Sequence, residues 1–374
     1  MGNATTTSNA GAAESGPAWA AVAPMGMGVF GRVGAESLPA SMLTLMARDL
    51  GISEGMAGQA VTATAVTAVF SSLLISVVTR KSDSRNVLLV FSLLLILSNL
   101  LVAVAPSVPF LLAGRVVLGV ALGGFWALST ATVMRLVPER YVSRALAIVV
   151  SGISAATIFA APVGSYLGDI WGWRPVFLAG AGLGAITLIL QLATLPRMPS
   201  RSLPQFGTLA ELLSRRHVAI ALLAALLVFS GHMAMFTYLR PYLESVTQVG
   251  VTAISMMLLA FGIATFLGNY LGGWLLQRSL RLTLAVAPLF IGSLAFMLAQ
   301  YGGHAGADAV VVALWGLAFG TVPVAWSTWI ARAVPDEAET AGGLLVAAIN
   351  LAITTGAAVG GLIVDTTGVS MLFL

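Results

Sequence analysis

Long apolar stretches separated by short polar breaks run along almost the whole chain. Each stretch holds about 20 residues, the number that a helix needs to cross a hydrocarbon layer roughly 30 Å thick. We place predicted spans at 18–46, 57–79, 86–106, 109–134, 145–169, 175–195, 218–243, 252–276, 281–300, 308–331 and 341–364. The pattern predicts an all-α polytopic membrane protein with eleven spans in the lipid bilayer.

Composition agrees with this pattern. Hydrophobic residues make up 58% of the 374 positions and charged residues 9%, whereas about a quarter of the residues in soluble domains are charged. The longest polar connection is Pro-rich at first and then amphipathic. We therefore predict an N-terminal tail at 1–17, a six-helix bundle at 18–195, a linker at 196–217 and a five-span bundle at 218–374.

Basic residues are distributed unequally between the two sets of loops. The loops on the side opposite to the N-terminus hold only Arg48 and Arg174. The loops on the side of the N-terminus hold Arg80, Lys81, Arg85, Arg135, Arg140, Arg144, Arg197, Arg201, Arg215, Arg216, Arg278, Arg281 and Arg332. This bias predicts a cytoplasmic N-terminus and a cytoplasmic linker. Because the charges are scattered and form no single patch, we expect no nucleic-acid partner.

The two halves of the chain resemble each other at a fixed offset. "GVALG" at 119–123 recurs as "GLAFG" at 316–320, and "RLVPE" at 135–139 recurs as "RAVPD" at 332–336, both displaced by 197 positions. Matches in the same order indicate two parallel six-helix repeats, with a substrate site near the bilayer midplane between them. Phe177 begins a sixth span, but its counterpart Phe373 is followed by one residue. A twelfth helix is therefore expected to be missing, through truncation or by nature.

Four charged residues lie inside predicted spans and not at their end positions: Arg32, Glu36, Arg115 and Arg240. A charge at the bilayer centre costs roughly 2.5 to 3.5 kcal/mol, so each is a functional candidate. Arg32 and Glu36 are one helical turn apart and could form a permanent pair that only neutralises two buried charges. Alternatively, Glu36 exchanges protons as the protein alternates its access, with Arg32 tuning it.

Aromatic and amide side chains supply candidates for substrate binding. They suit a ligand with a flat ring and several hydrogen-bonding groups, because stacking on a base contributes roughly 1 to 3 kcal/mol. The alternatives are interfacial anchoring for Trp and helix association for Asn, Thr and the small residues Gly119 and Gly123. Helical spacing places His232, Phe236 and Arg240 on one face of the seventh span. The candidates expected to share a cavity are Trp126, His232, Phe236, Trp326, Trp329, Asn350 and Thr354.

Enzymatic chemistry has little support in the sequence. The chain has no Cys, no P-loop, no His/Asp/Glu cluster with metal-ligand spacing, and only three His residues, far apart. We therefore expect no cofactor, no metal site and no ATP-driven pumping. Gradient-driven transport of a small molecule remains, with a non-transporting receptor or scaffold as the alternative. The buried charges count against a scaffold, because an inert bundle has no need of them.

The stretches "GRVVLGVALGG" and "APVGSYLGDIWGWRPVF" resemble motifs of the major facilitator superfamily, specifically of its twelve-helix drug and metabolite efflux antiporters. "GRVVLGVALGG" is similar to the fourth-helix Arg-x-x-x-Gly motif, with Arg115 and Gly119 in the matching positions. "APVGSYLGDIWGWRPVF" is similar to the fifth-helix antiporter motif, although Ala161 replaces the usual Gly. The loop "SVVTRKSDSR" departs more, with Ser76 for Gly and Arg80 for Asp.

Within that superfamily, the chain is similar to bacterial exporters of purine ribonucleosides. The similarity lies in "LMARDLGISEGMAGQAVTATA", "LGGFWALSTATVMRLVP", "MFTYLRP" and "VPVAWSTWIARA". It implies export of nucleosides such as inosine and guanosine in exchange for protons, by a monomer in the bacterial inner membrane. It also implies that Glu36 carries the proton and that Arg115 is its electrostatic partner. Exporters of sugars or drugs share many of these stretches, so another small compound is the alternative substrate.

The charge bias and the span count generate a test of topology. Reporter fusions at Arg201 and Arg332 should score as cytoplasmic, and a fusion at Leu374 should score on the outer side, because eleven spans place the two termini on opposite sides. Alkaline phosphatase and green fluorescent protein fusions measure the two outcomes. A cytoplasmic Leu374 would contradict the span count.

Overall fold

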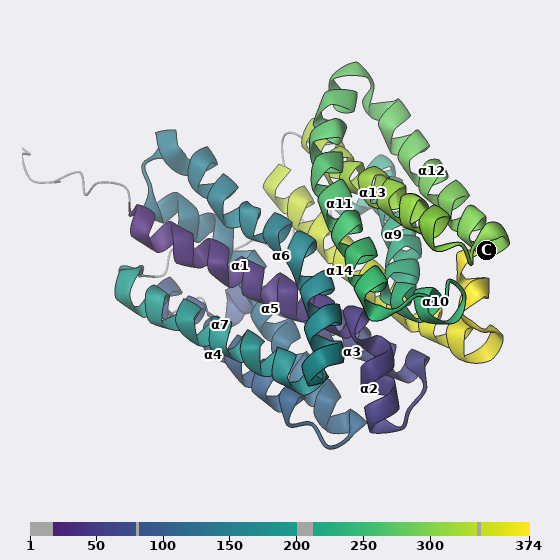
Figure 1. Ribbon diagram of the computed structural model, residues 1–374. Coiled ribbons are helices and arrows are strands. Elements are labelled where there is room, and N and C mark those ends of the chain that lie inside the picture. Colours follow the sequence, from purple (N-terminus) through teal and green to yellow (C-terminus); the bar gives the residue numbers. More distant parts are fainter. Residues whose placement is uncertain (1–17, 80–81, 200–211, 335–337) are drawn as a thin grey trace, which may run out of the picture.

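The computed structural model describes residues 18–79, 82–199, 212–334 and 338–374. All regular structure in these ranges is helical (Figure 1). The predicted tail 1–17, most of the predicted linker 196–217, and Arg80 lie outside them. The purple-to-teal helices form one group and the green-to-yellow helices another (Figure 1).

The first group contains α1 (Trp19–Ser41), α2 (Leu43–Leu50), α3 (Glu54–Val78), α4 (Ser84–Ala103), α5 (Val108–Leu136), α6 (Val142–Trp171) and α7 (Trp173–Thr194). The second contains α9 (Arg216–Thr237), α10 (Leu239–Ser245), α11 (Val251–Arg278), α12 (Leu280–Tyr301), α13 (Ala305–Ala333) and α14 (Ala338–Thr367). Short 3-10 turns lie at Glu139–Tyr141 and Val369–Phe373.

Ten helices of the described ranges are long and apolar enough to cross a membrane. They are α3, α4, α5, α6, α7, α9, α11, α12, α13 and α14. Helix α1 packs along α6 and α7 in the first group, but its glycines, two prolines and two charges make it less apolar. The all-α polytopic fold is confirmed, and the total of eleven spans stays a prediction.

Two predicted spans are interrupted in the structure. The span 18–46 ends as a helix at Ser41, and the span 218–243 ends at Thr237. Each break lies beside a proline, Pro39 in the first case and Pro241 in the second. A proline has no N–H for the carbonyl four residues earlier, and its ring crowds that carbonyl. The chain therefore turns into the short helices α2 and α10.

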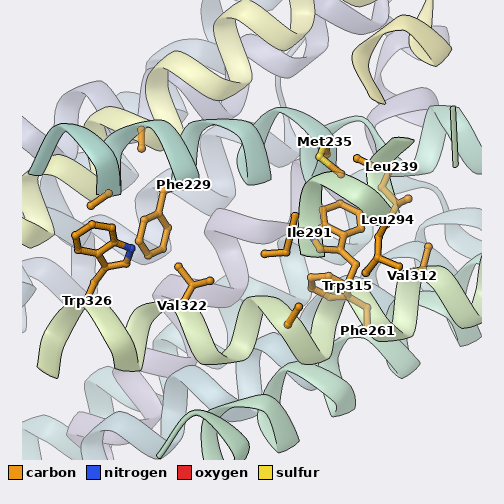
Figure 2. Packing of buried hydrophobic residues seen from close by; sticks show 14 of the residues in the cluster. Phe229, Met235, Leu239, Phe261, Ile291, Leu294, Val312, Trp315, Val322 and Trp326 are labelled. Atoms are coloured by element: carbon orange, nitrogen blue, oxygen red, sulfur yellow. The ribbon is translucent and has the colours of Figure 1, made fainter. Parts of the chain in front are cut away.

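Each helical group has its own hydrophobic core. The core of the first group is centred on Phe91 and Phe125, which are 1% exposed. The core of the second group is larger, and Figure 2 shows Trp315 beside Phe261 at its centre, with ring centroids 5.3 Å apart. The two groups are therefore two packed bundles, which also meet in a small apolar cluster of Leu43, Ala47 and Ala57 with Tyr238.

Glycines at equivalent repeat positions allow two helix pairs to approach closely. A Cβ atom on Gly123 of α5 would overlap the carbonyl oxygen of Ala68 in α3. A Cβ on Gly320 of α13 would overlap the carbonyl oxygen of Thr265 in α11 in the same way. These contacts confirm the packing interpretation of the small residues and place the repeated motif in equivalent surroundings in both bundles.

This packing predicts how alanine substitutions affect stability. Gly123→Ala and Gly320→Ala should each destabilise the protein by about 1 to 3 kcal/mol, because the added methyl group meets backbone of a packed helix. Gly292→Ala is the matched control, since nothing lies within 4 Å of its added Cβ. The fraction of monodisperse protein after heating in detergent measures the effect. Equal stability of all three variants would contradict the close approach.

Candidate functional site

A cavity of about 1040 Å³ lies between the two bundles. Its walls come from α1 and α6 on one side and from α9, α11 and α13 on the other, with single residues from α3 and α14. The volume is at the upper end of the range for small-molecule sites, about 300 to 1000 Å³. Most of the lining is apolar, and the polar groups include Glu36, Ser37, Ser154, Asn269, Ser327 and Thr328.

A cluster of polar residues joins the bundles at one end of the cavity. We call Ser41, Thr44, Ser165, Arg240 and Glu244 the end cluster. The Arg240 Nη1 donates to the Ser41 carbonyl at 2.7 Å and to Ser165 Oγ at 3.2 Å, while its Nε donates to Thr44 Oγ1 at 2.9 Å and to Glu244 Oε1 at 2.7 Å. Arg240 is 2% exposed. One guanidinium on α10 therefore holds α1, α2 and α6 of the other bundle.

A second contact lies between α3 and α14 at the same end. Asp365 Oδ2 accepts from Ser53 Oγ at 2.7 Å, and Asp365 Oδ1 accepts from the Gly55 N–H at 3.0 Å. The buried side chain of Tyr238 packs against Gly58. This end is the one that the charge pattern predicts to be outer. The cavity extends the opposite way, toward Arg332 near the end of α13.

Glu36 is the acidic residue in the cavity wall. Its side chain is half-buried, and its carboxylate has no hydrogen bond or ion pair with any residue that the structure describes. Arg115 contacts the backbone at this point: its Nη1 donates to the Ala35 carbonyl at 2.7 Å and its Nη2 donates to the Glu36 carbonyl at 3.2 Å. Arg115 thus fixes the position of Glu36 through the main chain.

Arg32 does not form the ion pair with Glu36 that the sequence analysis gave as one alternative. Its Nη1 donates to the Gly28 carbonyl at 2.8 Å, and its Nη2 donates to Ser92 Oγ at 3.1 Å. The guanidinium carbon lies 4.4 Å from the centroid of the Phe125 ring. Gly28 makes room for this arrangement, because a Cβ there would lie 2.6 Å from Arg32 Nη1. Arg32 therefore joins α1 to α4 and α5 and leaves the Glu36 carboxylate open to the cavity.

The aromatic part of the cavity comes from three helices. His232 and Phe236 of α9 were predicted from the sequence and line the cavity. Phe261 of α11 and Phe319 of α13 line it too, and sequence reasoning missed both. Trp315, also missed, lies one turn before Phe319 on the same helix. The one-turn spacing of these two aromatic residues on α13 was a signal for a shared helix face. The sequence alone does not show which neighbouring helix that face contacts.

Other predicted site residues lie outside the cavity lining. Trp126 is partly buried in the core of the first bundle. Trp326 is 6% exposed and packs with Trp329 in the core of the second. Asn350 Nδ2 donates to the Val346 carbonyl at 3.0 Å, and Thr354 Oγ1 donates to the Asn350 carbonyl at 3.0 Å, so both bond along α14.

Arg240 does not share a helix face with His232 and Phe236, contrary to the expectation from spacing. The break after Thr237 separates α9 from α10, and Arg240 then extends into the end cluster. The helical period used in the sequence analysis does not continue across the break.

Comparison with protein families gives one broad match. The model of the Major Facilitator Superfamily matches residues 25–357. The purine ribonucleoside efflux pump NepI of Salmonella paratyphi B is 45% identical over 352 residues, which cover 94% of this chain and 89% of that protein. The protein of the same name from Shigella sonnei is 44% identical over 354 residues, covering 95% and 89%.

Solved structures share the fold at much lower identity. The crystal structure of the nucleoside transporter NupG aligns with a TM-score of 0.76 and 15% identity over 95% of each chain. A bacterial homologue of the human lysosomal transporter Spinster, in an inward-facing and unoccupied conformation, aligns with a TM-score of 0.74 and 16% identity over 93% of this chain and 82% of that one. At these identities the likeness concerns the fold.

The end cluster predicts how the closed end responds to mutation. Arg240→Gln should raise, about tenfold or more, the rate at which a single cysteine at Ser37 reacts with a membrane-impermeant maleimide added from the outer side. Each lost hydrogen bond of a charged group contributes about 1.5 to 3 kcal/mol, and 1.4 kcal/mol is a tenfold change in an equilibrium. The chain has no native Cys to interfere.

Arg174→Gln is the matched control at the same end. Arg174 bonds to Asp49 and to the Ala105 carbonyl, both in its own bundle. The Arg174→Gln variant should therefore leave the rate of maleimide labelling unchanged. Equal labelling of the two variants would mean that the end cluster does not keep this end closed.

Proposed function

We propose that this chain, which belongs to the Major Facilitator Superfamily, exports purine ribonucleosides in exchange for protons. The observation that carries the proposal is the 45% identity to a purine ribonucleoside efflux pump, which extends over 94% of this chain. It is supported by a cavity between two bundles with one unpartnered carboxylate among the described residues. Transport requires such a cavity to face the two sides of the membrane in turn.

Glu36 is the proposed proton carrier. A carboxylate that lines a cavity and lacks a described partner can bind a proton from whichever side the cavity faces and release it after the conformational change. Arg115 acts as its positioning residue through the Ala35 and Glu36 carbonyls. Arg332, Tyr270 and His232 are the other lining residues with ionisable side chains.

The cavity wall offers chemistry that suits a nucleoside. Phe236, Phe261 and Phe319 provide ring surfaces for a planar base. Hydroxyl and amide groups of Ser37, Ser154, Asn269, Ser327 and Thr328 are available to the hydroxyl groups of a ribose. A mostly apolar site with a few placed polar groups is typical of small-molecule recognition.

The proposal also includes orientation and assembly. Both bundles and the cavity belong to a single chain, so we propose that it works as a monomer in the bacterial inner membrane. With the N-terminus in the cytoplasm, the closed end faces outward and the cavity extends toward the cytoplasm. An exporter collects its substrate from that side.

Inverted membrane vesicles test the function and the role of Glu36 together. Vesicles with the wild-type chain should accumulate labelled inosine when a pH gradient is imposed, and should not accumulate arabinose or a cationic dye. Glu36→Gln should abolish this accumulation, because the amide cannot carry a proton, while downhill exchange of inosine and its binding persist. Uptake with and without the gradient is the measurement.

Asp169→Asn is the control for the loss of a carboxylate. Asp169 is exposed on α6 and does not line the cavity, so its variant should accumulate inosine normally. Accumulation of arabinose or the dye in place of inosine would refute the proposed substrate. Normal uphill transport by Glu36→Gln would place the proton carrier elsewhere.

A further inference from the structure

The imidazole of His232 is packed among other aromatic rings. Phe319 stacks on it with centroids 3.3 Å apart and an interplanar angle of 6°. Phe236 and Phe261 lie nearly parallel to it at 5.7 and 6.2 Å. Phe319 therefore covers one face of the imidazole, and the polar atoms on the edge of the ring are the ones that can bond to a substrate.

One position on that edge is already bonded. The Trp315 Nε1–H donates to His232 Nδ1 at 3.1 Å. Trp315 is 0% exposed, so water does not compete for this bond. An indole nitrogen can only donate, so Nδ1 must be the bare, accepting nitrogen, and the ring proton lies on Nε2.

The Nε2–H is directed to no described protein group. It has no hydrogen-bond partner among the described residues. Some polar atoms without a partner, such as Trp326 Nε1 and Arg32 Nε, are completely buried, but His232 Nε2 is not one of them. His232 lines the cavity. The free N–H is therefore accessible from the space that the substrate occupies.

We infer that His232 is a hydrogen-bond donor of fixed tautomer that binds an acceptor atom of the purine base, with Trp315 as the positioning residue that fixes it. This inference rests on the proposed function and adds a specificity contact to it. The acceptor is a ring nitrogen or carbonyl oxygen of the base, because these atoms carry the lone pairs that can accept from the Nε2–H. A substrate without such an acceptor would leave the Nε2–H unpaired, which disfavours it.

The same bond excludes His232 as a proton carrier. Protonation of Nδ1 would place two N–H groups against each other and break the bond from Trp315. The other ionisable residues of the cavity lining are Glu36 on α1, Tyr270 on α11 and Arg332 on α13. The rings that contact the imidazole, Trp315, Phe319 and Phe261, carry no charge. His232 selects the substrate, and the carboxylate carries the proton.

Nitrogen NMR tests the tautomer without any substrate. The full chain carrying His217→Gln and His304→Gln leaves His232 as the single histidine, since the sequence has three. With 15N-labelled histidine, the spectrum should show the proton on Nε2 from about pH 5.5 to pH 8, across the range in which an ordinary imidazole titrates. Trp315→Phe should convert this signature to a mixture of tautomers that titrates. A proton on Nδ1 in the wild-type ring would overturn the inference.

Binding of labelled inosine to purified protein tests the contact itself. His232→Leu should weaken binding about tenfold, in line with the loss of one hydrogen bond that leaves a buried group unpaired. His232→Gln should restore most of the affinity, because the glutamine Nε2 occupies nearly the same place and donates. A merely structural role would not distinguish these two variants in affinity at equal thermal stability.

Trp315→Phe provides the readout for positioning. In a Glu36→Gln background, which removes the carboxylate, Trp315→Phe should make inosine binding depend on pH through the range in which the freed imidazole titrates. Binding should strengthen as the pH falls, because the neutral ring is a mixture of tautomers whereas the imidazolium always carries the Nε2–H that donates. The single Glu36→Gln variant should show no such dependence.

Two failures are distinguishable. If the wild-type chain binds inosine and Phe236→Ala weakens that binding, but His232→Leu binds as the wild type does, the inference is overturned and the proposed function stands. If the wild-type chain binds neither inosine nor guanosine, the proposed function fails, and the inference falls with it.

Discussion

A proline inside a membrane helix leaves a backbone carbonyl without its usual N–H partner, and lipid offers no replacement. In this chain Pro39 frees the Ala35 carbonyl, and Arg115 donates to it at 2.7 Å. Pro241 breaks the helix after Thr237, and the short helix that follows carries Arg240 into the other bundle. The two prolines thus determine where both arginines bond, and with them the position of Glu36 and the closure of one end.

The contacts between the bundles add hydrogen bonds to the kinds of contact found within each bundle. Within a bundle, glycines bring helix backbones close together around large apolar cores, and between the bundles Gly262 lies against the backbone of Thr157 in the same way. Between the bundles, the closed end is held by hydrogen bonds of Arg240 and Asp365. Polar groups at an interface can exchange their partners for water at a modest net cost, whereas separated apolar surfaces cannot. The large cores lie mainly within the bundles, so this end can part with the loss of hydrogen bonds and of a small apolar cluster around Tyr238.

The sequence predicts the parts of this structure that repeat at a regular period. Apolar runs located ten of the helices, and the repeated "GVALG" and "GLAFG" lie where the structure brings helix pairs close together. Membership of the cavity was harder to predict. His232 and Phe236 were found because they lie on one uninterrupted helix, but Phe261 and Phe319 reach the same place from other helices. Spacing along one helix carries no information about which neighbour faces it.

The direction of long side chains was also beyond the sequence. Arg32 and Glu36 have the spacing of an ion pair, yet the missing side chain at Gly28 gives the guanidinium a nearer site beside Ser92. Arg240 has the spacing of a cavity residue but follows a break. In both cases a local rule was overridden by a residue, glycine or proline, whose effect depends on what surrounds it.

The contact between Asp365 and the start of α3 affects the stability of the first turn of that helix. The first N–H groups of a helix lack partners inside the helix, and in α3 one of them, at Gly55, is satisfied by a carboxylate from the other bundle. The Ser53 side chain accepts from Met56 N–H and itself donates to the same carboxylate. Helix α3 is thus capped from across the interface, with negative charge at the positive end of its dipole. Parting of the bundles at this end would remove this cap and make the first turn of α3 less stable, so exchange of the Gly55 amide with solvent would report whether this end is open.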